Sequence, residues 1–329
     1  MLLNKTQFSI RSGSGLLTIL FLGITGIFPN MLHGQQLPVF HQKFTDDFLF
    51  NPGYTGLSGG SASASFRRIW TGIEDPANAY YISGHTLLAQ DKIGIGGNLF
   101  FEQLSFINNL RIAPSISYQI IKSEDYSVSF GISPELYQTR LDRGELFVRD
   151  PDDPLLLNPD EGVTFDVSSG IVFSSSRINA GVGFNRMVNF WEDDDNDSGV
   201  DLLSIISLSA SGLIPLRYGY DVFEPRIFYN ITPDGRNLLN VSGFYNYENI
   251  AVAGVTYRTN SVGVMSLGWW FENRILFSYS VEYNFSNAGR DLGVIHELTL
   301  RIDFNKQYFQ RVNPANQNPR ESSTFRKRR

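Results

Sequence analysis

The residues of this chain that could do chemistry are few and widely spaced. The 329 residues include four histidines and no cysteine. His41, His85 and His296 are scattered without a His-x-x-x-His spacing, so a zinc site is not expected. Ser286 could approach His296, but we interpret the histidines as structural. The sequence therefore predicts no enzymatic activity, no metal site and no cofactor.

One acidic stretch imitates the first half of a calcium-binding loop. Residues 194–199 read DDNDSG, which places oxygen ligands at alternate positions before a turn glycine. The bidentate carboxylate that should follow is replaced by Ile205. We interpret this stretch, and the carboxylates at 150–153, as solvated surface loops. Bridging of outer-leaflet lipid through divalent cations is the alternative.

The elements that must position any such site alternate with a period of two. From Ile275 to Phe285 the odd positions are apolar and most even positions are polar. The same alternation runs through 126–137, 163–174 and 296–304. Each segment therefore predicts a β-strand with one apolar and one polar face. A soluble β-sandwich shares this pattern, so other features must decide the class.

The number and length of the strands favour a membrane barrel. We expect fourteen strands of about ten residues, the length that a tilted strand needs to cross a bilayer. They are predicted at 61–70, 79–87, 93–102, 109–120, 126–137, 163–174, 178–188, 203–214, 222–231, 237–247, 249–259, 261–271, 275–285 and 296–304.

The connections alternate in length, as they do in outer-membrane barrels. Those after even strands are brief, such as 122–125 and 272–273, whereas 141–162 and 190–201 after odd strands are long and polar. Short periplasmic turns and longer outer loops produce this alternation. Aromatic residues expected at strand ends suit the membrane–water interface. They are Trp70, Tyr118, Tyr137, Phe190, Trp191, Tyr229, Tyr247, Tyr257, Trp270 and Phe304.

The two ends of the chain differ from the body. Residues 1–34 read as a secretory signal with a basic start and an apolar run. We expect a segment at 35–60, a barrel at 61–304 and a basic tail at 305–329 that emerges into the periplasm. The formal charge is -6 and much of the positive charge lies in that tail. A barrel body this acidic excludes a nucleic-acid role, and the tail is either disordered or a docking strip.

The segment 35–60 is not a strand in this interpretation. Four phenylalanines between 40 and 50 supply apolar area, and Asn51-Pro52-Gly53 predicts a turn. A barrel of fourteen strands is too wide for its wall side chains alone to fill. We therefore expect this segment to pack in or under the periplasmic mouth, with a plain linker as the alternative.

Two blocks carry a resemblance to a known family. Residues 35–56 end in an Asn-Pro-x-Tyr-x-Gly signature, preceded by aromatic residues. Residues 67–102 contain a basic-x-x-Trp-x-Gly element and a Ser-x-His-Thr-x-Leu strand. Together they resemble the mature start of the PorP/SprF family of type IX secretion outer-membrane proteins. The residues that match are Phe48, Asn51, Pro52, Tyr54, Gly56, Arg67, Trp70, Gly72, His85 and Thr86.

The resemblance implies a β-barrel in the outer membrane of a diderm bacterium. Relatives act in protein export, often with a large surface adhesin that carries a type IX C-terminal domain, and some serve gliding motility. Such a protein would contact its cargo, other subunits of the secretion machinery and outer-membrane lipid. The matched residues would serve structure or partner binding. A passive channel for small molecules is the alternative function.

Overall fold

A computed structural model describes residues 47–88, 92–123, 125–141, 162–188, 204–217, 221–259 and 261–304. The expected signal segment, the start of segment 35–60, most of the two long connections and the basic tail lie outside these residues. The stretches 194–199 and 150–153, His41, Phe190 and Trp191 therefore lie outside them as well. Within the described residues, no helix combines the length and the apolar character needed to cross a membrane.

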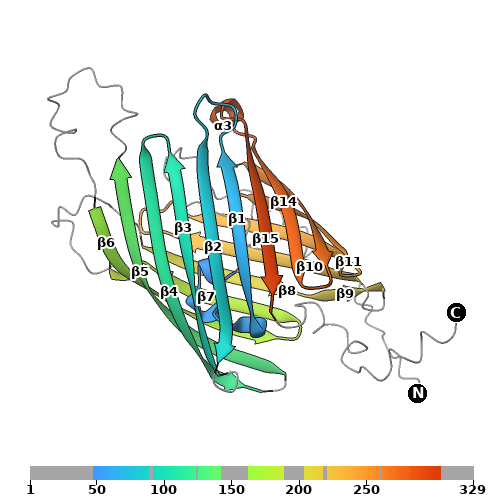
Figure 1. The fold of residues 1–329 in the computed structure, drawn as a ribbon. Coiled ribbons are helices and arrows are strands. Elements are labelled where there is room, and N and C mark those ends of the chain that lie inside the picture. Colours follow the sequence, from blue (N-terminus) through green and yellow to red (C-terminus); the bar gives the residue numbers. More distant parts are fainter. Residues whose placement is uncertain are drawn as a thin grey trace, which may run out of the picture. The chain divides into compact units, whose positions relative to one another are not determined.

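Strands make up most of the described chain (Figure 1). Their bounds are β1 (Gly60–Ile69), β2 (Ala77–Leu88), β3 (Ile93–Leu104), β4 (Ile107–Lys122), β5 (Tyr126–Leu141), β6 (Gly162–Ser175), β7 (Ile178–Asn185), β8 (Ile205–Gly212), β9 (Ile214–Leu216), β10 (Asp221–Ile231), β11 (Leu238–Tyr247), β12 (Ala251–Arg258), β13 (Val262–Phe271), β14 (Ile275–Asn284) and β15 (Val294–Asp303).

The strands form one closed antiparallel sheet. Each pairs with its neighbours in the sequence, and β1 pairs with β15 to complete the circle. The short strand β9 continues β8 beyond Leu213, and both pair with β10 in one register. The barrel therefore has fourteen strands around its circumference. This confirms the expected fold class and the expected strand number.

The two faces of the sheet have the polarity expected of a barrel in lipid. On β14 the buried side chains Ser278 and Ser280 alternate with Phe277 and Tyr279, which are 45% and 38% exposed. The buried polar residues point into the lumen, and the exposed apolar residues form the outer surface. A soluble protein would bury the apolar face instead, so this surface fits a bilayer.

The two ends of the barrel differ in their connections. The turns after β2, β4, β6, β11 and β13 are short, and Glu272 and Asn273 both have positive φ, as in two-residue hairpin turns. The long connections lie at the other end, which is the outer end of such barrels. There, α3 (Asn287–Asp291) precedes β15, and Leu292 accepts a hydrogen bond from Gly72. Two connections at this end, 105–106 and 259–261, are also short.

Prolines interrupt the sheet locally without opening it. The register places Pro114 of β4 opposite Pro134 of β5, and pairing lapses between Ile112 and Ile116. Neither proline can donate to the ladder, which accounts for the lapse. The hydroxyl of Ser133 donates to the Pro114 carbonyl at 2.7 Å and bridges it.

Two of the aromatic residues expected at the lipid interface point into the barrel instead. Tyr137 donates to the buried carboxylate of Glu135, and Trp270 packs against buried Leu276. The prediction for these two rings was wrong because each lies on the inward phase of its strand. Tyr118, Tyr247, Tyr257 and Phe304 are exposed on the outer surface as expected.

Candidate functional site

Residues 47–59 form a compact segment ahead of β1, which we term the inner segment. It consists of three short 3-10 helices, η1 (Asp47–Leu49), η2 (Pro52–Tyr54) and η3 (Leu57–Gly59). Asn51 caps η2 because its Oδ1 accepts from the Gly53 N–H at 2.8 Å, and Pro52 supplies the φ that a first helical residue needs. Gly56 has φ +73, which ends the turn and favours glycine.

The inner segment crosses the inner wall strand by strand. At its end, Gly56 contacts His85 of β2, and Thr55 contacts Ser115 and Ser117 of β4. Further back, Gly53 meets Ser129 of β5. Asn51 contacts β6, and Tyr54 contacts β8. Phe50 contacts both β8 and β10, and Asp47 contacts β10. The segment therefore lies inside the barrel and touches about half of its circumference.

The wall beneath the segment is built from small residues, which we term the seat. Its glycines leave no room for a side chain. A Cβ would overlap Thr55 at position 94, Pro52 at position 131, Asn51 at position 170 and the Phe50 carbonyl at position 183. Its serines donate to main-chain carbonyls of the segment, at 2.7 Å to Thr55, 2.6 Å to Gly53 and 3.1 Å to Phe50. The seat comprises Gly94, Gly131, Gly170, Gly183, Ser117, Ser129 and Ser207.

The serines of the seat donate to main-chain carbonyls rather than to side chains. They therefore bind the backbone of the inner segment and do not distinguish its side chains. Specific recognition then comes from Asn51, whose Nδ2 donates to the Ile171 carbonyl, and from Tyr54, whose hydroxyl lies 3.1 Å from Ser209 Oγ. Burial raises the pKa of the Tyr54 hydroxyl, and the nearby Asp47 carboxylate raises it further. Tyr54 therefore stays protonated and can donate.

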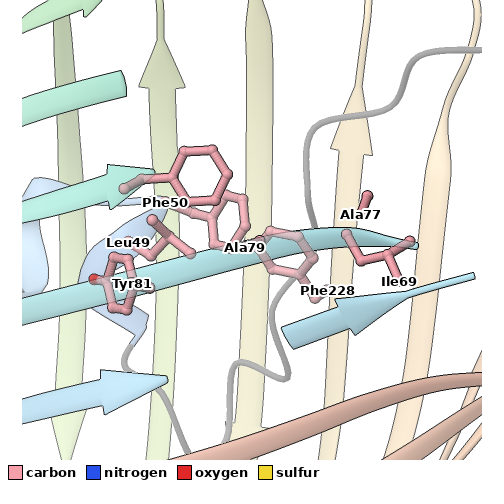
Figure 2. Close-up of a cluster of buried hydrophobic side chains, with 8 residues drawn as sticks. Leu49, Phe50, Ile69, Ala77, Ala79, Tyr81 and Phe228 are labelled. Atoms are coloured by element: carbon pink, nitrogen blue, oxygen red, sulfur yellow. The ribbon is translucent and has the colours of Figure 1, made fainter. Parts of the chain in front are cut away.

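Apolar side chains of the inner segment join opposite sides of the barrel. Leu49 and Phe50 pack in one buried cluster with Tyr81 and Ala79 of β2 and Phe228 of β10 (Figure 2). The Phe50 and Phe228 ring centroids are 5.2 Å apart. In the order of strands, β2 and β10 lie half a circumference apart. The cluster therefore spans the lumen from wall to wall at this level.

His85 anchors the end of the segment that leads into β1. Its Nδ1 accepts the Gly56 N–H at 2.8 Å, so this nitrogen carries no proton, and its Nε2 lies 3.1 Å from Ser61 Oγ. The Phe48 ring packs 5.3 Å from the imidazole. His85 is 4% exposed, and it belongs to the lumen wall near the periplasmic end of β2.

An ion pair anchors the other end of the segment. Asp47 pairs with Arg226 of β10, and Glu224 lies 3.7 Å from the same guanidinium. All three groups are largely shielded from solvent. Two carboxylates thus face one arginine, which fixes the start of the described segment to the wall.

Two charged networks line the lumen nearer the outer end. Arg111 of β4 binds Glu135 of β5 through two contacts of 2.6 and 3.0 Å. Glu282 of β14 lies 2.9 Å from both Arg67 of β1 and Arg258 of β12. Each network ties strands together across the inner wall. Buried charges of this kind persist only when they are paired and hydrogen-bonded.

The structure divides the residues that the sequence singled out into two groups. Phe48, Asn51, Pro52, Tyr54, Gly56 and His85 meet in and around the inner segment. The others lie elsewhere: Arg67 in a charged network, Trp70 and Gly72 at the outer end of β1, and Thr86 on β2 beside buried His85. They form no common site with the first group.

Sequence reasoning missed the seat and the charged networks. The alternation of serine and glycine on the polar face of β5 was visible in the sequence, but its role as a close-packing surface was not. Ser286 caps α3 by accepting from Gly289 N–H at 3.1 Å, and His296 bonds Tyr279 instead. Among the described residues, no group of three acidic or histidine side chains is arranged to bind a metal ion.

Comparison with known proteins identifies a family. The family model described as "Type IX secretion system membrane protein PorP/SprF" matches residues 32–302, which is most of the chain. No curated protein sequence matches this chain.

Several solved outer-membrane proteins are similar in structure. CymD, a monoaromatic hydrocarbon channel, has 13% identity and a TM-score of 0.48, with 83% of this chain and 95% of CymD covered. Omp33 of Acinetobacter baumannii has 6% identity and a TM-score of 0.45, covering 75% and 98%. A Pseudomonas aeruginosa FadL homologue has 10% identity and a TM-score of 0.43, covering 78% and 93%.

Proposed function

This chain belongs to the PorP/SprF family of type IX secretion system membrane proteins, and on that premise we propose that it partners the export or surface anchoring of one secreted cargo. It is an outer-membrane β-barrel of a diderm bacterium and not an enzyme. The cargo that we propose is an adhesin or similar surface protein with a type IX C-terminal domain.

The wall-to-wall cluster around Phe50 and Phe228 carries this proposal. A barrel that serves diffusion needs a continuous aqueous path, whereas here β2 and β10 are joined through Leu49 and Phe50. The lumen is therefore occupied by the protein's own chain at this level. An occupied barrel is better suited to hold a partner at its rim than to pass solutes.

In this proposal the signature residues have a structural task. Asn51, Pro52, Tyr54 and Gly56 shape the inner segment, while Phe48 and His85 fix its end against the wall. The segment and the seat then give the barrel a rigid interior. Cargo specificity is assigned to the outer loops and to the lumen surface above the segment.

A passive channel is the second candidate, and one observation favours it. The lumen wall is rich in buried polar and charged side chains, including Arg111, Glu135 and Glu282, as in barrels that conduct. Conductance in planar bilayers distinguishes the two functions. The proposed partner role predicts little conductance in the intact protein and a marked rise when Phe50 and Phe228 are both replaced by alanine.

The direct test is purification from native outer membrane with mild detergent, followed by mass spectrometry. We expect one large surface protein and subunits of the secretion machinery to co-purify. A chain lacking 306–329 tests whether the basic tail docks a periplasmic partner. If secretion is unchanged in that deletion and the barrel still assembles, the tail has no part in the proposed function. If the intact protein conducts and co-purifies with no partner, the channel function replaces the partner function.

A further inference from the structure

Six polar residues form a continuous row on the outer surface of the barrel, which we term the outer row. Each lies directly opposite the next in the strand registers, from β15 through β1, β2, β3 and β4 to β5. The members in this order are His296, Arg68, Asn78, Gln103, Asn108 and Arg140.

The outer row faces lipid rather than the lumen. Along β1, Arg68 alternates with buried Arg67 and Ile69 and shares its face with Phe66. Along β15, His296 shares its face with Leu298, which is 40% exposed. Side chains of one face repeat every second residue. The row therefore lies on the same face as the exposed apolar residues, nearer the outer end of the strands. It lies one or two residues from the outer end of each of its strands, the end at which such a barrel meets the outer leaflet.

Among the residues that the structure describes, the row is confined to one side of the barrel. At the corresponding level on the other side, the outward residues are aromatic or aliphatic, among them Tyr229, Leu239, Tyr257 and Tyr283. Such rings suit a neutral membrane interface. The two sides of the rim therefore face their surroundings with different chemistry.

The charge of the row is positive. Arg68 and Arg140 are both exposed, and within the described part of the chain no carboxylate pairs with either. The acidic residue nearest to Arg68 along the chain, Glu74, lies beyond the row in the exposed turn between β1 and β2. Asp142 follows Arg140 by two residues and lies outside the described residues, while Glu102 and Glu297, next to Gln103 and His296, are buried on the lumen side. His296 adds an imidazole that is oriented by a 2.6 Å hydrogen bond to Tyr279.

We propose that the outer row binds the phosphorylated headgroup of an anionic glycolipid in the outer leaflet. Arginine forks match phosphate oxygens with two parallel hydrogen bonds, and the amides of Asn78, Gln103 and Asn108 suit sugar hydroxyls and phosphate oxygens. Four strand spacings of about 4.8 Å separate the strands of Arg68 and Arg140, so the two arginines lie about 19 Å apart along the row. This length accommodates a headgroup with more than one phosphate. The inference rests on the outer-membrane fold and not on the proposed cargo role.

The test is lipid binding by the full-length detergent-solubilised barrel, measured by native mass spectrometry. The probes are bis-phosphorylated lipid A and the same lipid after removal of both phosphates. The test variant is Arg68→Gln with Arg140→Gln. The matched control is Arg177→Gln with Arg274→Gln, which removes two exposed arginines from turns at the opposite end. Heat-modifiable migration on gels shows that each variant has folded.

We expect the native chain and the control to prefer the phosphorylated lipid, and the test variant to bind it about tenfold more weakly, as loss of charge-assisted hydrogen bonds predicts. Equal binding of both lipids by the native chain overturns the proposal. An equal loss in the control overturns it as well, because the effect then follows net charge. If an acidic partner protein binds the row instead, the native chain binds the two lipids equally, and the test variant no longer binds that protein.

Discussion

Gly131 of the barrel wall lies directly beneath Pro52 of the inner segment, so close that a Cβ at position 131 would overlap the Pro52 carbonyl. The two residues are far apart in sequence, yet the fit allows no side chain between them. Gly170 stands in the same relation to Asn51. The absence of side chains at these wall positions is therefore what admits the segment.

Replacing Gly131 by alanine should expel the inner segment from its seat. Overpacking of this kind costs about 1–3 kcal/mol. The chain has no cysteine, so Ser129→Cys, which lies beneath Gly53, serves as a single reporter for a water-soluble maleimide. Labelling should accelerate about tenfold, since 1.4 kcal/mol is a factor of ten. Gly84→Ala is the control because a Cβ there meets no atom within 4 Å; equal labelling in both variants would contradict the fit.

Asn51→Ala should loosen the segment by removing its cap. Loss of the Oδ1 contact with Gly53 N–H costs about 0.5–2 kcal/mol, and the contact with the Ile171 carbonyl is lost as well. The same Ser129→Cys reporter measures the effect. Asn51→Ser retains a capping oxygen and should label at an intermediate rate. An Asn51→Ala variant that labels no faster than the parent would exclude a role for the cap.

His85→Leu should release the end of the segment next to β1. The Gly56 N–H would be left buried without its acceptor, which costs about 1–3 kcal/mol. Ser117→Cys, beneath Thr55, reports exposure of this end. His296→Leu is the matched control because its imidazole contacts Tyr279 at the outer surface. Faster labelling in His296→Leu than in His85→Leu would refute the assignment.

Glu135→Leu should destabilise the barrel wall strongly. Arg111 would keep its charge in a buried position without its carboxylate, at a cost of about 3–5 kcal/mol. The urea midpoint of the heat-modifiable form measures this loss. Asp234→Asn removes an exposed pair with Arg236 and should cost under about 1 kcal/mol. Adding Arg111→Met to Glu135→Leu should recover part of the stability; a double variant weaker than the single would argue against the buried-charge explanation.

The strands could be predicted from sequence because each one carries its own evidence. Alternation along β14 predicted its outward face, and its bounds to within one residue. The predicted strand at 203–214 begins two residues before β8 and ends at the first residue of β9, with Leu213 separating the two strands. Periodicity is a local signal, and strand order follows from it when neighbours in sequence pair. That is why the closed sheet was within reach of a single sequence.

The site was less predictable because its contacts are distant in sequence. The Asn51–Ile171 and Tyr54–Ser209 hydrogen bonds join residues 120 and 155 positions apart. Alternation shows which face Ser129 and Gly131 occupy, but it does not show what packs against them. The predicted positions of Tyr137 and Trp270 were wrong for a related reason. Proximity to a strand end does not show whether a side chain faces the lumen or the lipid.

The path of the inner segment also constrains how the protein is assembled. Its partners lie on strands β2 to β10, whereas the barrel closes only when β15, the last strand in the sequence, pairs with β1. The sheet of earlier strands can therefore curl around the inner segment before the last five strands, β11 to β15, join it. The inner segment would then act as an internal template: it would set the curvature of the sheet before β1 and β15 pair.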